Sequence, residues 1–192
     1  EEQVDIVEDI INMHENKPLV IVDPIMGDNG SIYPGLPEGI VGAMRKIVPF
    51  ADILMPNATE ASLILGKEYP SGKFEIEEVE NWLNELINIG CKEAIITSVN
   101  TKEGHFVYGY SEKDKIFRVP YTHYPVAFGG TGDMFSSLVT GKLGEGLSIK
   151  EACEYAVKIL NKILKEESKR GLDVIIDVPI EKYLVGLDHL LD

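Results

Sequence analysis

Three short apolar runs, each ended by a polar turn, most constrain what this chain can fold into. The runs are Leu19–Val22, Ala51–Met55 and Ala94–Ser98. Such continuous apolar runs are typical of strands buried on both faces, and helical patterns separate them. Strands that alternate with helices form a parallel sheet with helices on both faces. The sequence therefore predicts an α/β fold with a mostly parallel central sheet.

Polar and apolar residues alternate in His105–Tyr110 and again in Lys115–Val119, on either side of the turn-like Ser111–Asp114. This pattern predicts a hairpin. We expect it to be the first antiparallel element of the chain and to lie towards one edge of the sheet.

Helical periodicity predicts seven helices. Two of them open with a residue pair typical of a capping box, Asn57 with Glu60 and Ser148 with Glu151. The predicted helices cover about residues 3–14, 37–48, 58–65, 76–89, 131–142, 149–170 and 179–191.

The chain has 192 residues without an internal repeat or a linker, which predicts one domain over residues 1–192. It starts at Glu1 without Met, inside a helical pattern that runs from Val4 to His14. Because a domain seldom begins in the middle of such a pattern, we expect that an N-terminal part of the domain is missing.

A net charge of −14 argues against nucleic-acid and anionic-membrane partners and leaves a small-molecule ligand. No apolar run reaches the length of a membrane span. The two cysteines, Cys91 and Cys153, lie in apolar surroundings without metal-ligand spacing. We read them as reduced core residues of a cytoplasmic protein.

The stretch Gly129–Phe135 opens an apolar helix. Backbone N–H groups at Gly130–Gly132, together with the helix dipole, predict an anion site. Asp133 in the first turn could take a proton from a hydroxyl group that attacks a bound phosphate. A glycine-rich turn with a helix-capping Asp is the alternative.

Polar residues also follow each of the three predicted strands, where an open α/β sheet binds its ligands. Carboxylates such as these could hold Mg²⁺, and the hydroxyls could bind phosphate, although each pair is also compatible with ordinary turn or capping chemistry. The pairs are Asp23 with Asp28, Asn57 with Glu60, and Thr97 with Ser98. With Thr131 and Asp133 they form four clusters expected at one sheet edge, which favours phosphoryl transfer without a Walker A or kinase His-Arg-Asp motif.

Gly-Thr-Gly-Asp at 130–133 and Asn57-x-x-Glu60 resemble signature motifs of the ribokinase superfamily. With Asp-Pro-Ile-Met-Gly-Asp at 23–28, Met-Pro-Asn at 55–57 and Thr97-Ser98, the chain looks like a pyridoxal kinase. The resemblance runs through most of the chain in the expected order. It implies a ribokinase-like fold and ATP-dependent phosphorylation of the 5′-hydroxyl of pyridoxal, pyridoxamine or pyridoxine in vitamin B6 salvage.

The resemblance also implies roles for individual residues. Asp133 matches the catalytic base, and Gly130, Thr131 and Gly132 match the anion hole. Asp23, Asp28 and Glu60 match positions near Mg²⁺ and the ATP phosphates, Asn57, Thr97 and Ser98 match ATP contacts, and the backbone near Thr97 could border a K⁺ or Na⁺ site. Tyr33 is a candidate substrate neighbour, and relatives commonly form homodimers.

Two other functions stay open. Hydroxymethylpyrimidine (phosphate) kinase of thiamine synthesis would share Asp133 and the metal residues. That family usually shows a Lys-Gly-Gly-His-like segment where this chain has Thr97-Ser98-Val99. A non-catalytic nucleotide-binding domain is suggested by the expected loss of the N-terminal substrate region, although such a domain has no need of Asp133. Met55 stands where many relatives carry Thr, so one hydroxyl contact is absent.

Overall fold

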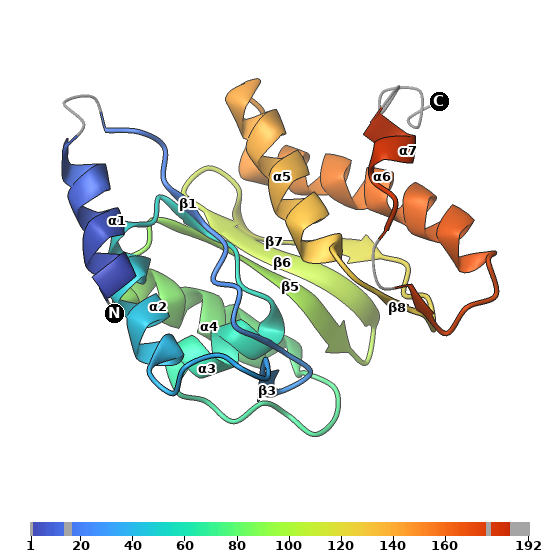
Figure 1. Cartoon of the computed structure of the whole chain (residues 1–192), viewed down its shortest axis with the longest axis horizontal. Coiled ribbons are helices and arrows are strands. Elements are labelled where there is room, and N and C mark those ends of the chain that lie inside the picture. Colours follow the sequence, from blue (N-terminus) through green and yellow to red (C-terminus); the bar gives the residue numbers. More distant parts are fainter. Residues whose placement is uncertain (1, 14–16, 176–177, 185–192) are drawn as a thin grey trace. The chain divides into compact units, whose positions relative to one another are not determined.

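The computed structural model describes residues 2–13, 17–175 and 178–184 (Figure 1). The chain divides into two compact units, Glu1–Arg118 and Val119–Asp192. Within the described residues no helix is long and apolar enough to cross a membrane.

A five-stranded mixed sheet forms the centre of the first unit. Its order is β1-β4-β5-β6-β7, and β7 continues into the second unit. β1 pairs with β4 and β4 with β5 in parallel, whereas β5 and β6 are antiparallel. The predicted parallel strands and the hairpin at one edge of this sheet are thus confirmed. The strands are β1 (Ile21–Val22), β4 (Ile53–Leu54), β5 (Glu93–Thr101), β6 (Gly104–Ser111) and β7 (Lys115–Tyr121).

The helices of this unit are α1 (Glu2–Met13), α2 (Ile40–Ile47) with the 3-10 turn Val48–Phe50, α3 (Ala58–Leu65) and α4 (Ile76–Ile89). α3 and α4 both contact β5 (Figure 1). Trp82 of α4 is 3% exposed and meets Phe74 edge to face, with ring centroids 5.3 Å apart, so its predicted place in the core is confirmed.

α2 begins later than predicted, and α1 buries little of its apolar face. α2 begins at Ile40, because Pro37 starts a turn in which its carbonyl accepts the Ile40 N–H at 3.0 Å. In α1 only Val4 is buried among its described apolar residues, while Ile6 and Ile10 are more than half exposed. His14 lies outside the described residues.

The capping signals are confirmed. Asn57 and Glu60 at the start of α3, and Ser148 and Glu151 further on, each form a complete capping box. Gly66 ends α3 with φ 67°, the left-handed conformation that glycine adopts most readily.

A second hairpin, which the sequence reading missed, joins β2 (Gly27–Asp28) to β3 (Ser31–Ile32). The expectation that residues 105–119 form the first antiparallel element is therefore wrong. The turn residues Asn29 and Gly30 have φ of 51° and 77°. An Asn-Gly pair is the strongest short hairpin signal, so the sequence did carry the information.

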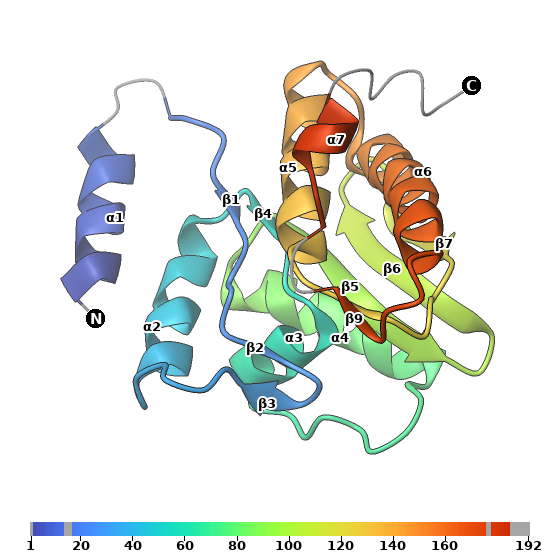
Figure 2. The same ribbon diagram turned by 45° about the vertical axis from the view of Figure 1, so that its right-hand side comes forward.

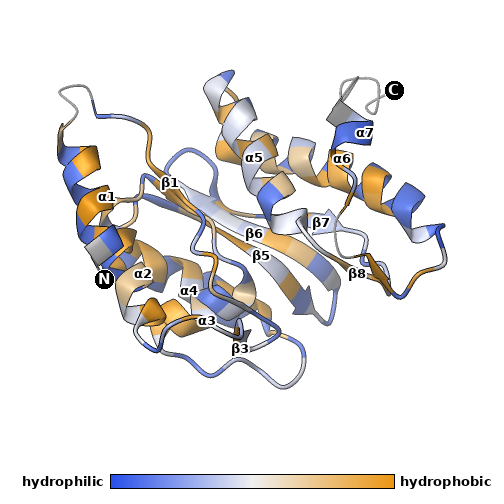
Figure 3. Ribbon diagram, in the orientation of Figure 1, coloured by the Kyte–Doolittle hydropathy of each residue, from blue (hydrophilic) through white to orange (hydrophobic). Residues whose placement is uncertain are grey.

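The second unit contains β8 (Ala127–Phe128), α5 (Thr131–Gly144), α6 (Ile149–Ser168), β9 (Val174–Ile175) and α7 (Glu181–Leu184). α5 and α6 lie side by side (Figure 2). Along α6 hydrophobic and hydrophilic residues alternate at helical spacing, and the apolar ones are buried (Figure 3). Cys153 of α6 is buried, as is Cys91 in the first unit. Of the predicted helix over 179–191, residues 181–184 are helical and 185–191 lie outside the described residues.

The β6–β7 hairpin provides a test of the packing. A Cβ at Gly109 of β6 would lie 2.3 Å from the ring of Phe117, which is only 7% exposed. Gly109→Ala should therefore destabilise the protein by about 1–3 kcal/mol through overpacking. Gly42→Ala in α2 is the control, because a Cβ there meets nothing within 4 Å and Ala favours the helix by about 0.5–1 kcal/mol. Urea unfolding midpoints should move in opposite directions, and a Gly109 variant as stable as the parent would contradict this packing.

Candidate active site

The segment Asp23–Asp28 leaves the carboxyl end of β1 and is held tightly. Met26 is fully buried, and its carbonyl accepts the Tyr33 N–H at 3.0 Å. A Cβ at Gly27 would lie 2.5 Å from the carbonyl oxygen of Ser31, so only glycine fits there. The segment is therefore a fixed part of the first unit.

Glu60 and Asn57 tie this segment to the start of α3. The Glu60 carboxylate accepts two backbone hydrogen bonds, from Met26 N–H at 3.1 Å and from Asn57 N–H at 2.8 Å. The Asn57 side chain accepts from Glu60 N–H at 2.9 Å through Oδ1 and donates to the carbonyl of Gly27 at 2.8 Å through Nδ2. The predicted capping box thus also anchors a segment about thirty residues away in the chain.

Burial raises the pKa of Glu60 from an ordinary 4.5 to about 7. The hydrogen bonds from Asn57 and Met26 lower this pKa, and the negative charge of Asp23 raises it. Glu60 is 3% exposed, so water solvates its charge poorly. A carboxylate with this environment favours a nearby cation, because a positive charge would relieve both the desolvation and the repulsion from Asp23.

Thr97 and Ser98 complete the cluster in the first unit. Thr97 pairs in parallel with Asn57, and its N–H donates to the carbonyl of Pro56 at 3.0 Å. The β5–β6 register shifts between Ile96 and Val99, and Ser98 has φ 59°. This bulge leaves Ser98 exposed. Bulges of this kind commonly re-aim a residue beside a binding site.

The structure places the other predicted residues of the first unit less centrally. Asp28 is exposed, and its carboxylate accepts hydrogen bonds from the N–H and the Nδ2 of Asn29 at 2.9 Å. Tyr33 is 42% exposed just after β3. Asp23 is close enough to Glu60 to raise its pKa. Among the described residues no three His, Cys, Asp or Glu side chains form a group that could by itself hold a metal.

In the second unit, Gly130–Asp133 form the start of α5. Gly130 has φ 79° and ψ 4°, and its carbonyl accepts the Met134 N–H at 3.0 Å. The N–H groups of Thr131, Gly132 and Asp133 precede this first bond of the helix, where an anion can accept them. Asp133 is exposed in the first helical turn.

The glycines of this turn leave open space. A Cβ at Gly130 or Gly132 would meet nothing within 4 Å. Gly130 is explained by its left-handed backbone, whereas Gly132 is required neither by packing nor by a positive φ. The open space at Gly132 leaves room for a ligand to approach the backbone closely.

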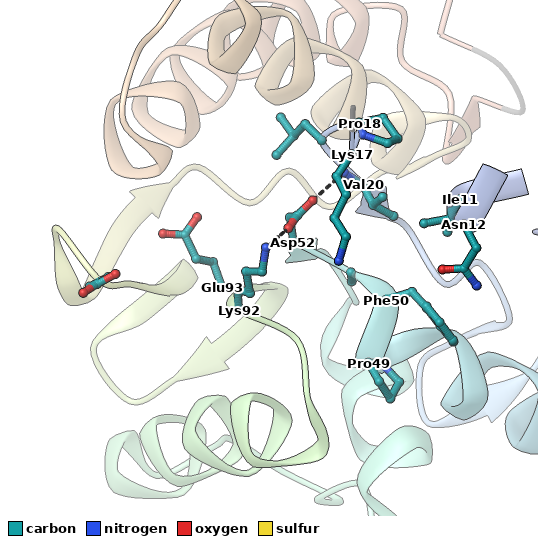
Figure 4. A pocket seen from close by; sticks show the side chains of 13 residues that line it. Ile11, Asn12, Lys17, Pro18, Val20, Pro49, Phe50, Asp52, Lys92 and Glu93 are labelled. Carbon is teal, nitrogen blue, oxygen red and sulfur yellow. Dashed lines mark hydrogen bonds and ion pairs between the residues drawn. The ribbon is translucent and has the colours of Figure 1, made fainter. Parts of the chain in front are cut away.

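A pocket of about 750 Å³ lies at the other end of the sheet in the first unit (Figure 4). Val20, Asp52 and Glu93, at or just before the beginnings of the strands, contribute to its lining. Asp52 accepts the Val20 N–H at 2.8 Å and forms an ion pair with Lys92. Because no predicted site residue lines this pocket, we do not assign the chemistry to it.

The sequence reading missed several partners in the first unit. Met26 and Gly27 bind the Glu60–Asn57 pair through backbone atoms, which leave no mark in a sequence. Thr59 accepts the Gly30 N–H at 2.9 Å through its hydroxyl and thereby also holds the β2–β3 hairpin. It lies inside Asn57-x-x-Glu60, which was the only signal that could have directed attention to it.

The sequence matches the family described as phosphomethylpyrimidine kinase over residues 1–175, and the chain belongs to this family. It is 28% identical to the pyridoxal kinase of Dictyostelium discoideum over 174 residues, which cover 82% of this chain and 56% of that protein. It is 31% identical to the pyridoxal kinase of Arabidopsis thaliana over 154 residues, which cover 76% and 47%. The chain thus spans about half the length of the curated relatives it matches.

Solved structures of related proteins also match the fold of this chain. A Bacteroides thetaiotaomicron protein described as a phosphomethylpyrimidine kinase, crystallised with pyridoxal, matches with a TM-score of 0.84 and 32% identity over 97% of this chain and 66% of that one. Pyridoxal kinase from Lactobacillus plantarum matches with a TM-score of 0.77 and 26% identity over 98% and 67%. The predicted ribokinase-like fold is confirmed.

Glu60 offers a direct test of the electrostatics. Its side-chain carboxyl signal in ¹³C NMR, assigned by its loss in Glu60→Gln, should titrate near pH 7. Asp23→Asn should lower this midpoint because it removes a like charge, whereas the exposed Asp28→Asn should leave it unchanged. Titration near 4.5 would contradict the arrangement.

The same shift has a consequence for stability. Because the pKa of folded Glu60 exceeds its ordinary value, the stabilising contribution of the protonated form is complete below about pH 4.5 and is lost as the pH rises through about 7. We expect this loss to be on the order of 3 kcal/mol at most. Urea unfolding of the parent and of Glu60→Gln between pH 5 and 8 measures it.

Proposed function

We propose that the protein to which this chain belongs phosphorylates the 5′-hydroxyl of pyridoxal, pyridoxamine or pyridoxine with ATP. The observation that carries this proposal is the start of α5. There the exposed Asp133 shares the first turn with three N–H groups that precede the first helical hydrogen bond, and the space beside Gly132 is open. The relatives named pyridoxal kinase support the choice of substrate, as does the similar structure crystallised with pyridoxal.

In the proposed mechanism, Asp133 accepts the proton of the substrate hydroxyl group as the hydroxyl oxygen attacks the γ-phosphorus. The bond between this phosphorus and the β,γ-bridging oxygen of ATP breaks, and ADP leaves. The N–H groups of Thr131, Gly132 and Asp133 donate to the oxygens of the transferring phosphoryl group, on which negative charge develops. Their direction is set by the helix before substrate binds, so they stabilise the transition state without reorganising.

Asp23, Asp28 and Glu60 are the candidates for holding Mg²⁺ near the ATP phosphates. Mg²⁺ in nucleotide sites uses one or two carboxylates, with water and phosphate oxygens as its other ligands. Asp23 and Glu60 fit this mode, because their negative charges repel each other and a cation would relieve that repulsion. Both Glu60 oxygens accept backbone N–H groups, which fixes the direction of the carboxylate. When bound, Mg²⁺ would neutralise phosphate charge. The protein orients the Glu60 carboxylate through the N–H groups of Met26 and Asn57.

Asn57, Thr97 and Ser98 are the candidates for ATP contacts, and the backbone near Thr97 is the proposed border of a K⁺ or Na⁺ site. The exposed hydroxyl of Ser98 is available for such a contact, whereas both ends of the Asn57 amide are held by backbone groups. We therefore assign Asn57 the part of holding the loop in place and Ser98 the direct contact. The proposal extends to Tyr33 beside the substrate ring, to a homodimer and to a cytoplasmic location.

Phosphorylation of hydroxymethylpyrimidine or its phosphate is the second candidate, because the matching family is described as phosphomethylpyrimidine kinase. The complete polypeptide should be assayed with Mg-ATP against each B6 vitamer and against hydroxymethylpyrimidine. A higher kcat/KM for a B6 vitamer supports the proposal, and a higher value for hydroxymethylpyrimidine replaces it. No phosphorylated product from any of them would favour a non-catalytic nucleotide-binding domain.

Gly132→Ala separates binding from folding. The open space around residue 132 predicts unchanged or slightly increased stability in urea. A methyl group at the anion site should nevertheless weaken Mg-ATP binding in calorimetry by roughly tenfold or more, because it blocks close approach to the backbone. Unchanged affinity would show that no phosphate approaches this turn.

Asp133→Asn tests the base. We expect kcat of the complete polypeptide to fall about 10²–10⁴-fold with little change in Mg-ATP affinity, because the amide cannot accept the proton. Glu154→Gln on the exposed face of α6 makes the same charge change and should leave kcat within twofold. Near-parental turnover of Asp133→Asn would remove the base assignment.

A further inference from the structure

The turn that precedes α5 is held from the C-terminal side of the chain. β8 pairs in parallel with β9, and the Ala127 N–H donates to the carbonyl of Asp173 at 3.0 Å. Gly129 is bound on both sides, since its N–H donates to the Ile175 carbonyl at 2.9 Å and its carbonyl accepts the Val178 N–H at 3.4 Å. The residue immediately before the left-handed Gly130 is therefore fixed by residues that follow α6.

This backbone ladder matters because the glycines of the turn contribute no side chains to packing. Gly130 and Gly132 have no side chains, and the space around them is open. The direction of the N–H groups at 131–133 depends on where the chain enters the helix. Gly129 sets that entry point, so its two hydrogen bonds orient the whole turn.

Val178, which binds Gly129, is joined to Tyr183 by a compact turn. The Ile180 N–H donates to the Val178 carbonyl at 2.8 Å, and the Tyr183 N–H donates to the Ile180 carbonyl at 2.8 Å. A displacement of Tyr183 would therefore be transmitted to Val178.

Tyr183 is in turn anchored to α6 through a buried carboxylate. Glu167 is 2% exposed and accepts hydrogen bonds from the Tyr183 hydroxyl, from Lys182 Nζ at 3.0 Å and from Arg170 at 3.1 Å. An apolar residue often stabilises a fold as well as a buried ion pair does. We therefore assign to Glu167 the orientation of its partners and not added stability. Its hydrogen bonds fix where Tyr183 and Lys182 lie.

We propose that Glu167 and Tyr183 are positioning residues for the anion-binding turn at Gly130–Asp133. Through the turn at 178–183 they hold Val178. Val178 and Ile175 in turn bind Gly129, and Gly129 directs the N–H groups that receive the phosphoryl group. Neither side chain touches substrate. The catalytic part of this inference rests on the proposed kinase function, whereas the mechanical part does not.

Glu167→Gln in the complete polypeptide tests the mechanical part by hydrogen exchange. The Gly129 amide should exchange at least tenfold faster, because its acceptor segment is released. Glu166→Gln is a matched control, since this neighbour has the same charge but forms an exposed ion pair with Lys169. Equal Gly129 exchange in the two variants overturns the proposal, even if the protein has no kinase activity.

Kinetics test the catalytic part. Glu167→Gln should lower kcat roughly ten- to hundredfold and leave KM for the acceptor substrate within about twofold, because misplaced N–H groups cost transition-state stabilisation. Faster exchange with parental kcat, or lower kcat with parental exchange, also overturns the proposal. If Glu167→Gln does not fold, Tyr183→Phe, which removes only one hydroxyl group, decides by the same two readouts.

Discussion

The candidate site in the first unit depends on one buried carboxylate. Glu60 binds the N–H of Met26 and that of Asn57, and so joins the segment after β1 to the first turn of α3. Asn57 extends the connection to β5 through its pairing with Thr97. Three segments distant in sequence are thereby kept at the carboxyl ends of neighbouring parallel strands, where open α/β sheets bind ligands.

Structural and chemical roles coincide in this carboxylate. The oxygens that cap α3 are the same atoms that would face a cation, and their burial keeps the pKa near 7. A group poised between charged and neutral forms responds to a nearby positive charge more than a solvated surface carboxylate does. The capping-box interpretation and the metal interpretation of Asn57-x-x-Glu60 are therefore compatible.

Local signals allowed much of the fold to be predicted. Periodicity predicted the bounds of α4 and the β6–β7 hairpin. Residue pairs only three positions apart predicted both capping boxes. The parallel-strand rule likewise predicted Asn57 and Thr97 at the same edge of the sheet, and the structure shows that the two residues pair. The pairing of β8 with β9 could not be predicted in this way, because two-residue strands nearly fifty positions apart have no period to detect.

For the candidate site, too, local sequence signals could indicate some features and not others. Residue types and spacing indicated Asp133, the glycines before it and the polar residues after each strand. They could not indicate the backbone donors of Met26, nor that Ser98 occupies a bulge with a positive φ, because neither depends on the identity of a side chain. Asn29-Gly30 was different, since its hairpin signal was present and was overlooked.

The pairing of β8 with β9 also bears on how the protein matures. During synthesis the glycine turn leaves the ribosome well before Ile175 and Val178, which bind Gly129. Until those residues emerge, the N–H and the carbonyl of Gly129 lack the hydrogen-bond partners that hold the turn. A nascent chain or a proteolytic product that ends within α6 would therefore contain the glycine turn without the hydrogen bonds that hold Gly129.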